Sequence, residues 1–158
     1  MQPTLFPLVG LPGSGKTTLA RRLETEKYAL RLTPDEWMLP LFGAGESGDK
    51  RDVLEGLLWT VAARALNRAL SLGLNVVLDY GLWGRWERDA YRAKAEAVGA
   101  RAELRFLDVP HDELWRRIEL RNQNLTPSQP YISADDLASF QAVFERPDAA
   151  ELESYPPA

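Results

Sequence analysis

Polar and apolar positions along the chain alternate between short strand-like runs and longer stretches with helical periodicity. The strand-like runs cover residues 5–9, 28–32, 75–78 and 102–107. Helices are expected over residues 16–26, 34–42, 51–72, 85–98, 110–121 and 133–144. This alternation predicts an α/β fold with right-handed crossovers and a parallel sheet. We expect four strands, or five if the tail from residue 145, which carries three prolines and is expected to pack loosely, supplies another.

The carboxyl ends of the expected strands are where a ligand should bind. In an open parallel sheet with helical crossovers, all strands point the same way, and ligands bind beyond their carboxyl ends. The loops after Val9, Leu32, Leu78 and Leu107 should therefore share one edge of the sheet. Functional residues are sought first in these loops.

The loop after the first strand carries the most specific motif in the chain. Its sequence GLPGSGKT, residues 10–17, fits the pattern G-x-x-x-x-G-K-[ST] in full. In this pattern backbone N–H groups surround the phosphates of a nucleotide, the lysine bridges the β- and γ-phosphates, and the threonine hydroxyl binds Mg²⁺. The expected nucleotide-binding residues are Gly10, Pro12, Gly13, Ser14, Gly15, Lys16, Thr17 and Thr18.

Two aspartates follow other strands at the same edge. Asp79 ends the run NVVLD, where a carboxylate can hold the magnesium ion through water. Asp35 follows the second strand and could accept a proton from a substrate hydroxyl. However, Asp35 also lies in the first turn of a helix, where the helix dipole alone favours an acidic residue. The segment from Thr33 to Glu36 resembles a capping box, and both interpretations of Asp35 remain open at this point.

Arginines in the helix over residues 110–121 are candidates for stabilising charge on a transferring phosphoryl group. Arg117 and Arg121 lie on or beside the face that carries Leu114 and Ile118. The polar loop that follows, up to residue 132, is long enough to close over a nucleotide. The alternative is a solvated helix with ordinary ion pairs.

Three residues just after Asp79 are weaker candidates for contacting a substrate. They are Trp83, Arg85 and Arg88. An indole can stack on a ring, and an arginine can hold a phosphate. The alternatives are core packing for the tryptophan and surface positions for the arginines.

Composition narrows the class of protein. A chain of 158 residues with 45% hydrophobic and 27% charged residues suits one soluble domain, covering residues 1–158. The absence of cysteine excludes disulfides and thiolate sites, and a single histidine disfavours histidine-based metal sites. The net charge of −4 argues against nonspecific nucleic-acid binding. No apolar run reaches the ~20 residues that span a bilayer, and the start lacks a signal peptide, so we expect a cytoplasmic protein without a membrane partner.

Taken together, the motifs resemble those of small P-loop kinases of the AAA_33 or zeta-toxin-like kind, with gluconate kinases and the kinase domain of polynucleotide kinase as relatives. GLPGSGKTT resembles their phosphate loop, and LTPDEW their acidic segment after the second strand. VVLDYGLW, DELWRRIELRN and FERPDAAE resemble their third strand, their lid entry and their closing segment. The resemblance implies a three-layer P-loop sandwich with four to five parallel strands, helices on both faces and a lid at about residues 117–132.

The resemblance also implies a reaction. It makes Asp35 the catalytic base, with Lys16, Arg117 and Arg121 as further catalytic residues and ATP and Mg²⁺ as cofactors. The leading hypothesis is a phosphotransferase that moves the γ-phosphoryl group of ATP to a hydroxyl of a small molecule. The alternatives are a nucleotide-dependent switch or ATPase with a protein partner, and a 5'-hydroxyl nucleic-acid kinase. The sequence leaves the acceptor and the oligomeric state open.

Overall fold

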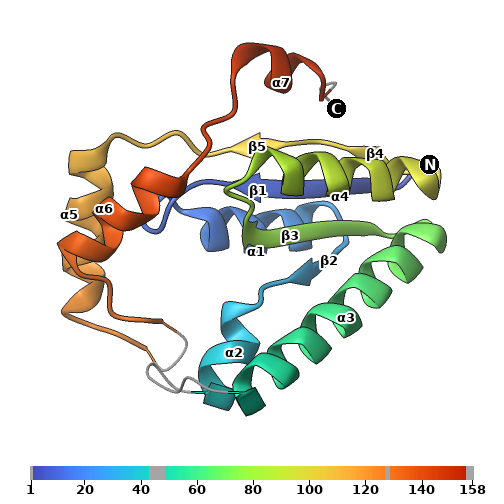
Figure 1. The fold of residues 1–158 in the computed structure, drawn as a ribbon. Coiled ribbons are helices and arrows are strands. Elements are labelled where there is room, and N and C mark those ends of the chain that lie inside the picture. The colour runs from blue at the N-terminus through green and yellow to red at the C-terminus, as the bar shows by residue number, and fades with distance from the viewer. Residues whose placement is uncertain (1, 43–48, 127–128, 156–158) are drawn as a thin grey trace.

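The central element of the fold is a parallel β-sheet. The structure is a computed structural model that describes residues 2–42, 49–126 and 129–155. Its strands are β1 (Thr4–Val9), β2 (Ala29–Leu32), β3 (Asn75–Gly81), β4 (Arg101–Ala102) and β5 (Arg105–Phe106). The order across the sheet is β2-β3-β1-β4, with β5 also paired to β1, and every pair is parallel (Figure 1). The predicted fold class is confirmed.

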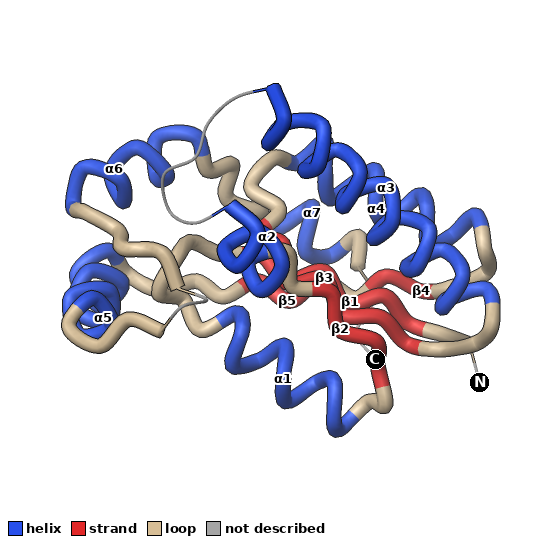
Figure 2. The backbone as a smooth tube through the Cα atoms, turned by 90° about the horizontal axis from the view of Figure 1, so that it is seen from below, coloured by secondary structure: helices blue, strands red, loops and turns tan. Residues whose placement is uncertain are grey.

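Helices cover both faces of this sheet. They are α1 (Lys16–Glu26), α2 (Asp35–Phe42), α3 (Asp49–Ser71), α4 (Arg85–Ala97), α5 (His111–Asn122), α6 (Ala134–Val143) and α7 (Ala149–Glu153). Helix α1 lies on one face, and α3, α4 and α7 lie on the other (Figure 2). Side chains of strand β1 alternate between the two faces of the sheet. Phe6 and Leu8 pack with α1, whereas Leu5 and Val9 pack with α3 and α4. No helix among the described residues is long and apolar enough to cross a membrane.

The run over residues 102–107 forms two short strands instead of the single predicted strand, and Pro7 accounts for the break. Both short strands keep one register against β1, with Leu5 opposite Ala102 and Leu8 opposite Arg105. The amide of Glu103 donates to the carbonyl of Leu5 at 2.8 Å. In this ladder the carbonyl of Glu103 would accept from residue 7, but proline has no N–H to donate. One missing donor thus interrupts the ladder.

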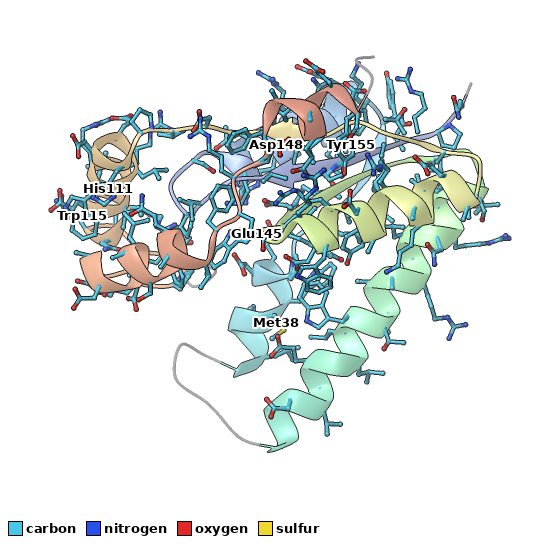
Figure 3. All side chains as sticks on the ribbon, turned by 45° about the horizontal axis from the view of Figure 1, so that its top comes forward. Met38, His111, Trp115, Glu145, Asp148 and Tyr155 are labelled. Carbon is cyan, nitrogen blue, oxygen red and sulfur yellow. The ribbon has the colours of Figure 1, made fainter. Side chains whose placement is uncertain are left out.

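The tail packs against the fold, so the prediction of a loose tail was wrong, and its described part contains no strand. Helix α7 begins after Asp148, whose side chain accepts a hydrogen bond from the amide of Glu151. Glu151 is 2% exposed and Tyr155 is 6% exposed. Tail residues Glu145, Asp148 and Tyr155 lie on the side of the molecule that carries α4 (Figure 3). The burial of Glu151 and Tyr155 holds the tail against the fold, although its prolines suggested loose packing.

The predicted common edge of the sheet is present. The carboxyl ends of β1, β2 and β3 lead into the loops before α1, α2 and α4. Helices α5 and α6 lie beyond this edge in both ribbon views (Figures 1 and 2). They are joined by a small apolar cluster that includes Leu114, Ile118 and Leu137, together with Leu11 of the glycine loop. This cluster attaches the α5–α6 pair to the loop.

Candidate functional site

The glycine loop between β1 and α1 has a shape that only glycine allows at key positions. Gly13 and Gly15 have φ angles of 82° and 96°, in the left-handed region that other residues rarely adopt. A Cβ on Gly13 would also lie 3.0 Å from the carbonyl oxygen of Leu114. Helix α1 begins at Lys16 with no side-chain cap on its first turn. Its first amides are therefore available to an anion, which the helix dipole also favours.

Lys16 extends from this loop and forms no salt bridge within the described residues. Its ammonium nitrogen Nζ donates to the carbonyl of Leu11 at 3.0 Å. Burial lowers the pKa of Lys16 to about 8, although the nearby carboxylates of Asp79 and Asp35 favour the charged form. A buried cation with an incomplete set of partners suits the phosphates of a nucleotide.

Two other polar atoms at the edge are buried and have no hydrogen-bond partner in the part of the chain that the structure describes. They are the hydroxyl Oγ of Ser14 in the loop and the guanidinium Nε of Arg121 in α5. Buried polar groups in folded proteins are nearly always satisfied, so orphaned atoms call for a partner such as a ligand. Their position beside Lys16 fits a bound phosphate chain.

The side chain of Asp79, at the end of β3, accepts hydrogen bonds from two threonines. Thr17 Oγ1 donates to Asp79 Oδ2 at 2.7 Å, and Thr33 Oγ1 donates to the same oxygen at 3.4 Å. A hydroxyl and a carboxylate oxygen are the hard donors that Mg²⁺ prefers. The described residues contain no group of three His, Cys, Asp or Glu side chains placed for a metal ion. This donor set therefore fits Mg²⁺ held by few protein ligands together with nucleotide phosphates and water.

Asp35 stands in the first turn of α2 at the same edge. Partial burial of its carboxyl group raises its pKa, and the negative charge of Asp79 raises it further. The positive charges of Lys16 and Arg121 act in the opposite direction. These mutual influences show that the structure brings the four predicted residues Lys16, Asp35, Asp79 and Arg121 into one electrostatic environment.

The prediction of a capping box at the start of α2 was wrong, because the side chains of Thr33 and Glu36 bind other partners. The amide of Glu36 donates to the carbonyl of Thr33 at 3.1 Å, as in a helical turn. The Glu36 carboxylate, however, pairs with Arg31 at 3.0 Å and with Arg21 at 3.2 Å. These ion pairs, with Arg31 first, lower the pKa of Glu36. The hydroxyl of Thr33 is directed to Asp79 instead of capping the helix.

The two arginines of α5 differ in their contacts. Arg117 is exposed, pairs with Glu113 at 2.6 Å and donates to the carbonyl of Gly13 at 3.4 Å. It therefore touches the glycine loop while also making the ordinary ion pair that the alternative interpretation offered. Arg121 donates only to the carbonyl of Pro130, at 3.3 Å, among the described residues. Burial lowers the pKa of Arg121, and no carboxylate is bonded to it in this part of the chain.

The prediction that Arg88 contacts a substrate was wrong. Its side chain is fully buried and binds both carboxylate oxygens of Glu151, at 2.5 and 2.9 Å. It also donates to the carbonyls of Leu82 and Trp83. Arg88 therefore joins the tail to the β3–α4 loop and has no surface left for a ligand.

Trp83 and Arg85 are also engaged within the fold. The Trp83 indole is half-buried, lies 5.1 Å from the ring of Phe140 and donates to the carbonyl of Gly10 at 3.4 Å. Trp83 therefore contacts the glycine loop through the carbonyl of Gly10. Arg85 is exposed and pairs with Asp148 of the tail at 3.3 Å. A substrate role for either residue stays a prediction.

Sequence reasoning missed the contribution of Thr33 and Arg31 at this edge. Arg31 donates to the hydroxyl of Thr33, which in turn donates to Asp79. The only signal in the sequence was the position of Thr33 at the carboxyl end of a strand. A threonine two residues before the first turn of a helix reads more simply as a cap.

Sheet order, glycine loop and acidic strand end together define a class: a P-loop protein with the kinase type of fold. A family model described as an AAA domain, AAA_33, matches residues 5–147. The chain therefore belongs to the AAA_33 family. A search of curated proteins finds no match.

Several solved structures share this fold. One chain in the "Pnkp1/Rnl/Hen1 RNA repair complex" is 22% identical, with a TM-score of 0.72, over 97% of this chain and 45% of that chain. A putative kinase from Chloroflexus aurantiacus is 19% identical, with a TM-score of 0.69, over 99% of this chain and 83% of that one. A gluconokinase from Sinorhizobium meliloti is 18% identical, with a TM-score of 0.59, over 94% and 78%. The chain thus spans less than half the length of the first of these proteins.

Proposed function

We propose that this protein is an ATP-dependent kinase that transfers the γ-phosphoryl group to a hydroxyl of a small molecule. The observation that carries the proposal is the gathering of Lys16, Asp35, Asp79 and Arg121 beside a glycine loop in which Ser14 Oγ has no partner among the described residues. Such an arrangement offers donors for a phosphate chain, oxygens for a metal ion and a carboxylate for a hydroxyl proton. The AAA_33 family and the fold shared with kinases support it.

The proposed donor half of the site is the glycine loop with its neighbours. Loop amides, Ser14 and Lys16 bind the phosphates, and Thr18, the exposed residue next in α1, completes the predicted set. Thr17 and Asp79 would hold Mg²⁺, which when bound neutralises charge on the β- and γ-phosphates. Arg121, together with Arg117, stabilises negative charge on the transferring phosphoryl group.

The proposed acceptor half centres on Asp35. An acceptor hydroxyl oxygen forms a bond to the γ-phosphorus while the bond from that phosphorus to the bridging oxygen of ADP breaks. The hydroxyl proton passes to the Asp35 carboxylate, which later releases it to water. The raised pKa of Asp35 makes it a stronger base than an ordinary aspartate, and this favours proton acceptance near neutral pH.

The proposed lid covers residues 117–132, of which residues 127 and 128 lie outside the described part. Its first residues are the last turns of α5, and Asn122 fastens its end by donating to the carbonyl of Ile132 at 2.7 Å. Arg121 thus lies in the last turn of α5, beside the residue that fastens the end of the proposed lid.

A 5'-hydroxyl nucleic-acid kinase is the second candidate, because the chain shares its fold with a protein of an RNA repair complex. A long nucleic acid needs a groove of unpaired basic side chains. Here several arginines near the site already pair with carboxylates: Arg31, Arg85, Arg88, Arg117 and Arg146. This pairing favours a small acceptor.

Transfer from γ-labelled ATP to a panel of acceptors tests the proposal. The panel holds sugars, hydroxyl-bearing antibiotics, nucleosides and short 5'-hydroxyl oligonucleotides. Label on a small hydroxyl compound supports the proposal, and label only on oligonucleotides supports the second candidate. Slow release of labelled phosphate to water, accelerated by a protein partner and by no acceptor, would instead favour an ATPase or switch.

A further inference from the structure

Thr33 occupies a buried position between the two halves of the proposed site. It follows directly after β2, is 3% exposed, and lies two residues before Asp35. Its hydroxyl donates to the carboxylate of Asp79, which is 7% exposed and also accepts a hydrogen bond from Thr17. One buried hydroxyl therefore links the loop that bears the proposed base with the proposed metal-binding carboxylate.

The proton of the Thr33 hydroxyl has a fixed direction. A hydroxyl has one proton to donate and lone pairs with which to accept. Arg31 Nη1 donates to Thr33 Oγ1, so the oxygen acts as acceptor toward Arg31 and its proton is left for Asp79 Oδ2, 3.4 Å away. Arg31 itself is held by Glu24 at 2.8 Å and by Glu36 at 3.0 Å. The donor is thus oriented by a chain of ion pairs.

Both threonine hydroxyls converge on one oxygen of Asp79. Within the described residues, the side-chain hydrogen bonds to Asp79 come from Thr17 and Thr33, and both go to Oδ2. Two hydrogen bonds to one oxygen restrict the rotation of the carboxylate, and Oδ1 would then be available to water bound to Mg²⁺. Outer hydrogen bonds of this kind orient carboxylate ligands and commonly change metal affinity by about 10–100-fold.

We propose that Thr33 is a positioning residue that orients Asp79 for Mg²⁺ and couples the metal-binding edge to the loop that carries Asp35. This inference rests on the proposed function in placing Mg²⁺ at Thr17 and Asp79. Thr33 itself touches neither metal nor substrate. Its effect is exerted through the carboxylate of Asp79.

The test measures how Mg²⁺ changes the affinity of the protein for an ATP analogue that cannot be hydrolysed. Calorimetric titrations are run in EDTA and over a series of Mg²⁺ concentrations. Thr33→Val removes the hydroxyl and keeps the shape, whereas Thr33→Ser keeps the hydroxyl. Thr60→Val is the matched control, because the hydroxyl of Thr60 is exposed on α3 and donates to the carbonyl of Gly56 in the same helix.

We expect Thr33→Val to raise the Mg²⁺ concentration for half-maximal effect about 10-fold or more, with affinity in EDTA within about twofold of the wild type. Thr33→Ser should stay within about threefold of the wild type, and Thr60→Val should match it. Where transfer is measurable, its Mg²⁺ dependence should shift by the same factor while KM for the acceptor changes little.

The inference would be overturned if Thr33→Val had the Mg²⁺ dependence of the wild type. It would also be overturned if Thr33→Ser shifted the Mg²⁺ dependence as much as Thr33→Val. A wild-type protein whose nucleotide affinity ignores Mg²⁺ would overturn it as well. Should Thr33→Val not fold, Thr33→Cys, a weak donor of similar size, is measured with the same expected loss. Because the readout is binding, a wild type that binds Mg²⁺ and nucleotide but transfers nothing contradicts the proposed function alone.

Discussion

The edge of the sheet around the glycine loop and the junction between α4 and the tail both bury charged groups, but they satisfy them differently. At the junction, Arg88 makes four hydrogen bonds, two to Glu151 and two to the carbonyls of Leu82 and Trp83. At the edge, within the residues that the structure describes, Arg121 makes one bond to a carbonyl and its Nε has no partner. A charge satisfied within the fold indicates a structural role, whereas an unsatisfied one indicates a ligand site.

The comparison separates two arginines that the sequence offered for the site, Arg121 for the transferring phosphoryl group and Arg88 as a weaker candidate for contacting a substrate. Both follow a strand that ends at the active edge, and both were candidates for contacting a phosphate. The difference comes from the partner: Glu151 reaches Arg88 from the tail, and no carboxylate is bonded to Arg121 among the described residues. The predictions below break or sharpen this comparison.

The largest expected effect is on transfer in Arg121→Met. Removing an arginine that stabilises transferring phosphate commonly costs about 10³-fold or more in kcat. Stability should change by less than about 1 kcal/mol, since the lost bond is a single contact to a carbonyl. Arg116→Met, on the same helix and exposed beside its ion-pair partner Glu113, is the control and should keep full activity. Equal activity in both variants would remove Arg121 from the mechanism.

Next comes the stability of Arg88→Met, measured by urea denaturation. Breaking a buried ion pair by removing one partner costs about 3–5 kcal/mol, because the other charge stays buried and unpaired. The double variant Arg88→Met, Glu151→Leu should recover much of this loss, since no unpaired charge remains. A single variant as stable as the wild type would contradict the structural role assigned to Arg88.

Alkaline pH should weaken the tail junction by a smaller amount. Burial is the main cause that raises the pKa of Tyr155 to about 12, and its hydroxyl donates to the carbonyl of Arg88 at 3.2 Å. The folded state keeps this proton where an unfolded tyrosine, with a pKa near 10, has lost it. Stability is therefore fully present below about pH 10 and falls by up to about 2 kcal/mol as the pH rises through about 12.

Tyr155→Phe is the control for that pH dependence. Urea midpoints of the wild type and the variant should draw together as the pH rises from 9 to 11.5, because only the wild type loses a bound proton at this position. Parallel curves over this range would show that Tyr155 does not titrate differently in the folded and unfolded states.

The smallest expected effect is in Arg85→Ala, also at the junction. Its ion pair with Asp148, at 3.3 Å, is exposed, and such pairs contribute about 0–1 kcal/mol. A thermal melt within a few degrees of the wild type is expected. A loss as large as that of Arg88→Met would show that exposed contacts, and not the buried pair, hold the tail.

Local signals in the sequence were sufficient for the donor half of the site. The glycine loop depends on left-handed glycines and a helix start, which are encoded within a few residues. The position of Asp79 followed from a buried strand with an acidic end. The six helices expected before residue 145 were placed within a few residues because their periodicity is strong, whereas α7 in the tail was not expected.

Long-range partners explain what the sequence did not show. Arg88 is recognisable as structural only once Glu151, 63 residues away, is known to reach it. The split between β4 and β5 depends on the register that places Pro7 where an amide would donate to the carbonyl of Glu103. Thr33 reads locally as a helix cap, and its contact with Asp79 is set by the pairing of β2 with β3. In each case the observed contact depends on sheet register or on tail packing, and neither is encoded by neighbouring residues in the sequence.

The most direct test of the central claim compares the wild type with Asp35→Asn for both ATP binding and transfer to the acceptor that the panel identifies. Removing a general base commonly costs about 10²–10⁴-fold in rate. We predict a loss of this size, with ATP affinity within about threefold of the wild type because the glycine loop is untouched. Normal turnover in Asp35→Asn, or a loss of ATP binding equal to the loss of transfer, would contradict the account.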